Sequence, residues 1–156
     1  MQIIFNAFRL KPLDEVLPAA QAAGVGVLAR VPLASGLLSG KYDEHTEFAA
    51  DDHRSYNRNG EAFDQGETFS GVDYAQGVDA ARRFSKLVAD EAPEGTTPAQ
   101  AALAWAAQQP GVTAVIPGAR NVSQAEANAA AGRLPQLSPA FDAGVHAIYD
   151  LSLIHI

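Results

Sequence analysis

The sequence contains no cysteine, which excludes disulfides, thiolate metal sites and cysteine nucleophiles. Basic residues are also few: 11 lysines and arginines face 18 aspartates and glutamates, and the formal net charge is −7. A surface that binds nucleic acid or an anionic membrane needs a basic face, so neither partner is expected. No apolar run reaches the roughly 18 residues of a membrane-spanning helix, and the N-terminal residues lack the features of a signal peptide. A small-molecule partner and a cytoplasmic location are therefore favoured.

Side chains that carry chemistry are sparse as well. The histidines are scattered along the chain, and His45 and His53 could form a metal site with Asp51 and Asp52, although a solvated loop explains them better. The sequence has no Gly-x-Ser-x-Gly nucleophile elbow. We therefore expect neither a metal centre nor a complete catalytic constellation in these residues.

What the sequence does contain is apolar material for a core, since 47% of its residues are hydrophobic. Three short apolar runs predict strands at residues 2–6, 26–31 and 112–117. Strands that alternate with helices indicate parallel βαβ units, in either a doubly wound sheet or a (β/α) barrel. The high alanine content and the excess of arginine over lysine also suggest a GC-rich bacterial genome. Five helices are expected from apolar periodicity and capping residues, at residues 14–23, 73–90, 97–107, 121 onward and 138–149.

Capping residues mark two of these helix starts most clearly. Thr97 is the predicted N-cap of one helix, with Pro98 at the first helical position and Gln100 completing a capping box. Asn121 and Gln124 repeat the pattern of an N-cap and a third-position partner. These two helices are therefore expected to begin directly after Thr97 and Asn121.

Two segments do not fit the alternation. Residues 43–70 are polar, acidic and punctuated by glycine without periodicity, which is typical of a functional lid or a disordered insert. Residues 151–156 add an apolar end where the last helix is expected to have stopped, and codons that spell them resemble a transposon end used in sequencing libraries. We interpret them as a non-native tail from a sequencing adapter, so that the natural sequence stops at Asp150.

The segment after the second strand has the composition of a phosphate-binding loop. Residues 32–42 combine small side chains and two glycines, Gly36 and Gly40, with Lys41. Small residues let backbone N–H groups approach an anion, and the lysine adds a positive charge. The glycine spacing is not that of a Walker motif, and a plain loop between strand and helix is the alternative.

A second candidate binding segment follows the third strand. Gly118 permits close approach of a ligand, and Arg120, Gln124 and Asn128 lie on neighbouring turns at a helix start. This pattern is typical of a site that binds an anion and an adenine. The alternative is that Arg120 is a solvated surface charge and Gln124 only caps the helix.

Together the two segments resemble strands six to eight of the aldo-keto reductase family. The matching residues are Gln2, the run 33–37, the run 40–42, the run 116–120, and Gln124. The resemblance covers residues 1–150 and implies an α/β fold, a partial (β/α)8 TIM barrel with about three parallel strands and five helices. Barrels commonly hold phosphate in the loops after strands seven and eight, which is where the two segments would lie.

The resemblance implies NADPH as the cofactor and a small carbonyl compound as the substrate. Gln2 would contact the nicotinamide carboxamide, and Arg30 would stack on the nicotinamide face in place of an aromatic ring. Lys41 and Arg54 would close over the pyrophosphate. The loop residues that hold it would be Pro32, Leu33 and Ser35. The adenosine end would contact Gly118, Arg120, Gln124 and Asn128, with Arg120 and Gln124 on the 2′-phosphate.

The family's catalytic aspartate, tyrosine, lysine and histidine are expected on earlier strands, so the resemblance assigns no catalytic residue to this chain. We therefore predict a C-terminal, cofactor-binding part of an NADPH-dependent reductase that converts an aldehyde or ketone to an alcohol. One alternative is an NADP-binding, redox-sensing regulatory subunit of the same fold. Another is a free-standing doubly wound domain that binds phosphate.

Overall fold

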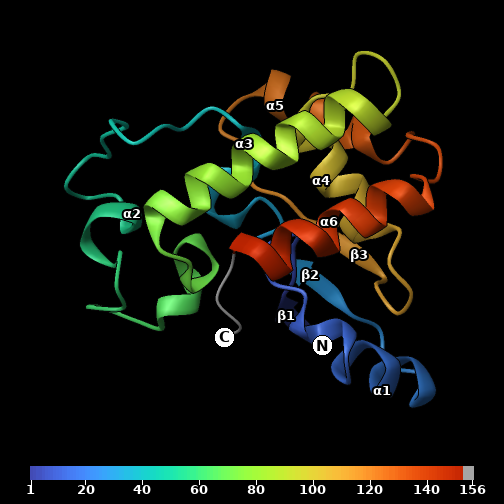
Figure 1. The fold of residues 1–156 in the computed structure, drawn as a ribbon. Coiled ribbons are helices and arrows are strands. Elements are labelled where there is room, and N and C mark those ends of the chain that lie inside the picture. The colour runs from blue at the N-terminus through green and yellow to red at the C-terminus, as the bar shows by residue number, and fades with distance from the viewer. Residues whose placement is uncertain (153–156) are drawn as a thin grey trace.

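The computed structural model describes residues 1–152, and within them three short strands form one parallel sheet (Figure 1). The strands are β1 (Gln2–Ile4), β2 (Leu28–Arg30) and β3 (Ala114–Ile116), in the spatial order β1-β2-β3. Ile4 pairs with Arg30 and Arg30 with Ile116, so the carboxyl ends of all three strands meet at one edge. The predicted α/β fold with three parallel strands is confirmed.

Each strand is shorter than the apolar run that predicted it. After β1, the chain turns at Asn6, whose side-chain oxygen accepts a hydrogen bond from the Phe8 N–H at 2.9 Å. After β2, Val31 has a φ of 53°, and this left-handed conformation is incompatible with a strand. Polar turn contacts and local backbone geometry therefore end the hydrogen-bonded strand pairing, although the apolar residues of each run continue beyond it.

Six α-helices lie in the described residues, one more than predicted. Thr97 and Gln100 form the predicted capping box, and the side chains of Asp73 and Asn121 cap their helices as N-caps. The first helix begins two residues later than expected because residues 11–13 form a separate 3-10 turn. The helices are α1 (Val16–Ala22), α2 (His53–Tyr56), α3 (Tyr74–Glu91), α4 (Pro98–Ala107), α5 (Val122–Ala131) and α6 (Pro139–Ser152).

The expectation that the last helix stops near Tyr149 was wrong, because α6 continues through Leu151 to Ser152. The side chain of Leu151 is exposed, so packing does not impose the extension. Adding a residue to an existing helix costs little and leucine is a good helix former. The proposed non-native tail therefore begins inside the helix, and its residues 153–156 lie outside the described part.

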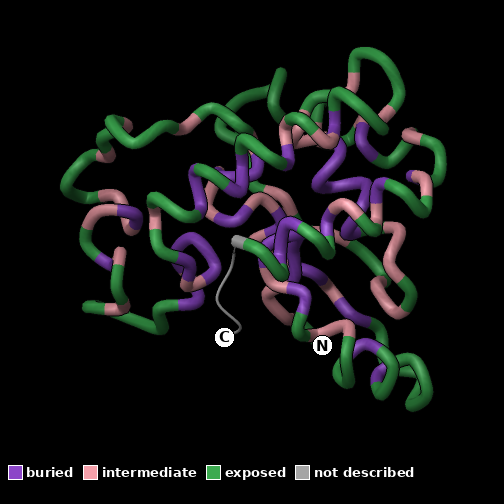
Figure 2. The backbone as a smooth tube through the Cα atoms, in the orientation of Figure 1, coloured by how far each residue is buried: buried purple, intermediate pink, exposed green. Residues whose placement is uncertain are grey.

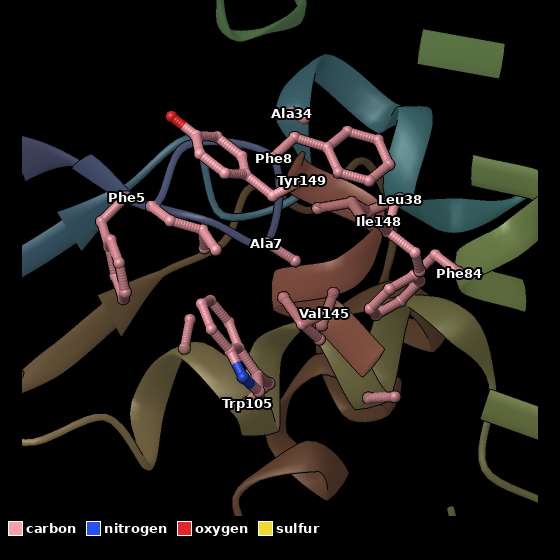
Figure 3. Packing of buried hydrophobic residues seen from close by; sticks show 14 of the residues in the cluster. Phe5, Ala7, Phe8, Ala34, Leu38, Phe84, Trp105, Val145, Ile148 and Tyr149 are labelled. Carbon is pink, nitrogen blue, oxygen red and sulfur yellow. The ribbon is translucent and has the colours of Figure 1, made fainter. Parts of the chain in front are cut away.

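The core lies on one face of the sheet, where helices α3, α4 and α6 gather (Figures 1 and 2). Phe5 stacks on Trp105 of α4 with ring centroids 5.5 Å apart, and Phe84 of α3 meets Phe141 of α6 edge to face. Figure 3 shows Val145, Ile148 and Tyr149 of α6 in the same cluster. These contacts join the long helices to the first strand.

The other face of the sheet has no buried residue. Side chains alternate along a strand, so the paired positions Ile4, Arg30 and Ile116 share this face, and Ile116 is 45% exposed. Ala29, on the opposite face, is completely buried. The helices thus cover one face of the sheet and leave the other open.

The segment 43–70 is ordered, so the prediction of a disordered insert was wrong, and the alternative of a functional lid stays a prediction. It contains α2 and two 3-10 turns, and in Figure 1 it extends as a cyan-to-green loop to one side of α3. Buried Asn57 accepts hydrogen bonds from the N–H groups of Ala62 and Phe63, while Asn6 donates to Ser70 across 64 positions of sequence. Polar side chains, which carry no periodic signal, hold the segment in place.

No described helix is long and apolar enough to cross a membrane.

Candidate functional site

A cleft of about 880 Å³ opens at the carboxyl ends of β2 and β3. Its walls are the loop after β2, the loop after β3 with the start of α5, and residues from the segment 43–70. The volume is within the range of cofactor and ligand sites. All the predicted cofactor residues except Gln2 and Arg30 line it, namely Pro32, Leu33, Ser35, Lys41, Arg54, Gly118, Arg120, Gln124 and Asn128.

The two exceptions lie on the open face of the sheet. Gln2 is exposed at the start of β1 and pairs with Leu28, two residues before Arg30. Because alternate strand residues share a face, Gln2 and Arg30 point to the same side of the sheet. Arg30 contacts the cleft residue Glu67, whereas Gln2 lies at the amino-terminal end of β1, away from the edge where the cleft opens.

The loop after β2 has a strained backbone. Ala34 and Ser35 have φ angles of 48° and 57°, in the left-handed region that non-glycine residues rarely adopt. Gly36 follows with a φ of 99°, and a Cβ built there would lie 2.5 Å from the Tyr42 hydroxyl oxygen. Only glycine permits this conformation together with this close approach.

The hydroxyl of Ser35 joins this loop to the segment 43–70. It donates to the backbone carbonyl of Glu67 at 3.3 Å and accepts from the Phe69 N–H at 3.0 Å. The side chain predicted to hold pyrophosphate is therefore engaged within the chain, and an anion there would be contacted through backbone groups. Ser35 has a positioning role that composition alone did not indicate.

Arg30 is paired with Glu67 rather than presenting a free guanidinium face. Its terminal nitrogens lie 2.6 and 2.5 Å from the two carboxylate oxygens of Glu67. This pair raises the pKa of Arg30 and lowers that of Glu67 below its ordinary value, chiefly through these hydrogen bonds. Stacking of Arg30 on a ring would require the pair to open or to turn as a unit.

Arg54 is the most buried of the cationic residues that line the cleft, with 9% of its surface exposed. It donates to both carboxylate oxygens of Asp52 and to the Tyr42 hydroxyl, and its guanidinium lies 4.5 Å from the ring centre of Phe48. Hydrogen bonds from Arg54 hold the pKa of Asp52 well below its usual range. Arg54 is thus a fixed positive charge at the cleft wall.

Arg120 is exposed by comparison: 77% of its side chain is accessible, and a terminal nitrogen lies 3.9 Å from the Asp52 carboxylate. The backbone N–H of Arg120 donates to the side-chain oxygen of Gln124 at 2.8 Å. In a capping box, Gln124 would accept from the N–H of the N-cap Asn121, but here it accepts from the residue one position earlier. Asn128 donates to the carbonyl of Gly118 at 3.0 Å. These contacts hold the loop backbone and do not engage the Arg120 guanidinium.

Several residues that line the cleft were not predicted, chiefly Tyr42, Asp52, His53 and Glu67. Three of them belong to the segment 43–70, whose composition indicates a lid or a disordered insert and no particular residue. The Asp-His-Arg run at 52–54 is a possible signal, because an N-cap aspartate two residues before an arginine can both cap and pair with it. Within residues 1–152, no group of three or more potential ligands could hold a metal ion.

The walls of the cleft are both charged and apolar. Lys41, Arg54 and Arg120 supply positive charge, Asp52 and Glu67 supply negative charge, and Leu33 and Ile116 are apolar. A Cβ placed on Gly118 would meet nothing within 4 Å, so the backbone there is accessible to a ligand.

The sequence model of the aldo/keto reductase family matches residues 1–150, so the chain belongs to this family. The resemblance noted from the sequence is confirmed. Members of the family generally bind NAD(P)H and act on small carbonyl compounds. The α/β fold is accordingly part of a (β/α)8 barrel.

Individual relatives give the same assignment. The chain is 37% identical over 145 residues to a probable voltage-gated potassium channel subunit beta from Arabidopsis thaliana, covering 86% of this chain and 39% of that protein. It is 33% identical over 146 residues to an uncharacterized oxidoreductase from Mycobacterium bovis, covering 91% of this chain and 39% of the relative. A glycerol dehydrogenase structure from Gluconobacter oxydans superposes with a TM-score of 0.75 at 25% identity, covering 97% of this chain and 42% of that one. The chain thus spans about two fifths of the length of these relatives.

Proposed function

We propose that residues 1–150 are the C-terminal, cofactor-binding part of a cytoplasmic, NADPH-dependent aldo-keto reductase that reduces an aldehyde or ketone to an alcohol. The observation that carries the proposal is the convergence of Lys41, Arg54 and Arg120 on one cleft at the carboxyl ends of β2 and β3. Barrel enzymes bind phosphate at this end of their last strands. The family assignment of residues 1–150 supplies the class of cofactor.

In this proposal each element of the cleft has a separate task. The loop after β2, with Lys41 and Arg54, holds the pyrophosphate, and the start of α5 presents Arg120 and Gln124 to a 2′-phosphate. Gln2 and Arg30, on the open face of the sheet, would contact the nicotinamide. When bound, the cofactor supplies the hydride, and the chain's own residues orient it and exclude water. The proton donor comes from the earlier strands of the barrel.

A redox-sensing regulatory subunit is the second candidate. It is favoured by the 37% identity to a protein named as a potassium channel subunit beta. The same cleft would hold the cofactor, and the difference would lie in turnover. The free-standing doubly wound domain is disfavoured, because such sheets carry helices on both faces, whereas here one face has no buried residue.

The decisive experiment uses the complete protein that carries this chain. NADPH fluorescence is titrated first, and reduction of a reactive aldehyde is then followed by the loss of nicotinamide absorbance. Saturable binding with multiple turnovers supports the reductase. Saturable binding without turnover supports the regulatory subunit, and no binding of NADPH or NADH contradicts both.

A further inference from the structure

One carboxylate lies between two of the arginines that line the cleft. Asp52 accepts from Arg54 through both oxygens, at 2.8 and 2.5 Å, and its Oδ2 is 3.9 Å from a terminal nitrogen of Arg120. Its side chain is only 17% exposed. A negative charge therefore already occupies the space where these two cations approach each other.

The position of this carboxylate is fixed by the backbone as well as by Arg54. Asp52 is the N-cap of α2, and its Oδ1 accepts from the Arg54 N–H at 2.9 Å. The hydrogen bonds from Arg54 keep the pKa of Asp52 low, so the group is charged at neutral pH. The carboxylate therefore cannot leave without breaking both the cap and the pair.

A fixed carboxylate discriminates between the two nicotinamide dinucleotides. It can accept a hydrogen bond from a ribose 2′-hydroxyl, as acidic residues do in NAD sites. Against a 2′-phosphate, which carries a charge of about −1.5 to −2, it is repulsive. It also competes with that phosphate for Arg120.

We propose that Asp52 is a specificity-determining residue that reduces the preference of the cleft for NADPH over NADH. This inference rests on the proposed function, since it assumes that Arg120 faces the 2′-position. Arg120 attracts the 2′-phosphate and Asp52 opposes it, so the measured preference is the difference between the two. An entirely structural role for Asp52, as cap and as support for Arg54, is the competing explanation.

The substitution Asp52→Asn separates these explanations. The amide oxygen can still cap α2 and accept from the Nε of Arg54, while the charge and the acceptor for the Arg54 Nη2 are lost. Asp51→Asn is the matched control, since Asp51 is the exposed neighbour and does not line the cleft. Dissociation constants are measured on the complete protein for NADPH and NADH, and for adenosine 2′,5′-bisphosphate and adenosine 5′-monophosphate. Each pair differs only in the 2′-phosphate.

We expect Asp52→Asn to tighten binding of the 2′-phosphorylated ligands about tenfold, as removal of one nearby opposing charge allows. Binding of the other two ligands should change by less than about threefold. Asp51→Asn should leave unchanged, within each pair, the ratio of the affinity with the 2′-phosphate to the affinity without it. If this affinity ratio is unchanged in Asp52→Asn, or if all four ligands bind equally more weakly, the inference is overturned in favour of the structural role. A wild-type protein that binds none of the four would contradict the proposed function itself, and the inference with it.

Discussion

The guanidinium of Arg30, at the end of β2, donates to both carboxylate oxygens of Glu67, which lies 37 residues later in the chain. Ser35 adds a second connection, to the carbonyl of Glu67 and the N–H of Phe69. The segment 43–70 is thus attached at two points to the strand end and to the loop that forms the cleft. These contacts are made entirely within the chain.

Breaking the ion pair should loosen this attachment. Glu67→Gln removes the charge and one acceptor, and a charge-assisted contact of this kind contributes about 1–2 kcal/mol. We expect amide hydrogen exchange around Phe69 to become roughly 5- to 30-fold faster. Glu61→Gln is the control, because Glu61 lies in the same segment but bonds to its neighbour Asn59. Equal effects of the two substitutions would show that the pair does not hold the segment.

Acid should abolish the same attachment. The pKa of Glu67 is lowered in the folded state by its hydrogen bonds to Arg30, so its stabilising contribution is complete above the ordinary glutamate pKa of about 4.3. The contribution is lost as the pH falls through the lower, folded value. The difference in melting temperature between wild type and Glu67→Gln should be constant from about pH 8 to 5 and shrink below about pH 4. A difference that grows on acidification would contradict this account.

Local patterns predicted the parts of the fold that local chemistry decides. The capping box at Thr97 and the N-cap at Asn121 could be identified because their partners lie three residues away. The loops around Gly36 and Gly118 could be predicted because the glycines and small residues that indicate them follow directly on a strand. By contrast, the pairing of Arg30 with Glu67 depends on distant side chains, so no sequence pattern reveals it. For the same reason the sequence left open whether residues 43–70 form a lid or a disordered insert, and it did not indicate their contacts with Ser35.

The glycine at position 36 should be essential to the cleft. Gly36→Ala must accommodate both a φ of 99° and a Cβ 2.5 Å from the Tyr42 hydroxyl. Gly95→Ala is the matched control, because Gly95 has a φ of 81° but nothing within 4 Å of its would-be Cβ. Both should lose about 1 kcal/mol from the backbone, and Gly36→Ala should lose more and weaken NADPH binding. Comparable melting temperatures and NADPH affinities for the two variants would contradict a close contact between Gly36 and Tyr42 in the loop after β2.

The isolated 156-residue chain should not behave as a stable monomer. Within the described residues β1 and β3 each pair only with β2, and no residue on the open face of the sheet is buried. Unpaired edges promote association, and apolar area left uncovered forfeits about 25 cal/mol per Å². We expect a helical circular dichroism spectrum, a broad melt, aggregation and no aldehyde reduction. A sharp two-state melt of a monomer at micromolar concentration would contradict this prediction and support a free-standing domain.

The most direct test of the account is the affinity of the complete protein for NADPH and NADH before and after Arg120→Ala. A charge-assisted contact to the 2′-phosphate contributes about 1.5–3 kcal/mol, so NADPH binding should weaken roughly 10- to 150-fold while NADH binding changes little. Arg133→Ala is the control, since Arg133 is exposed just after α5 and does not line the cleft. It should affect neither cofactor. Equal losses of NADPH and NADH affinity in Arg120→Ala would contradict the assignment of this cleft to a 2′-phosphorylated cofactor.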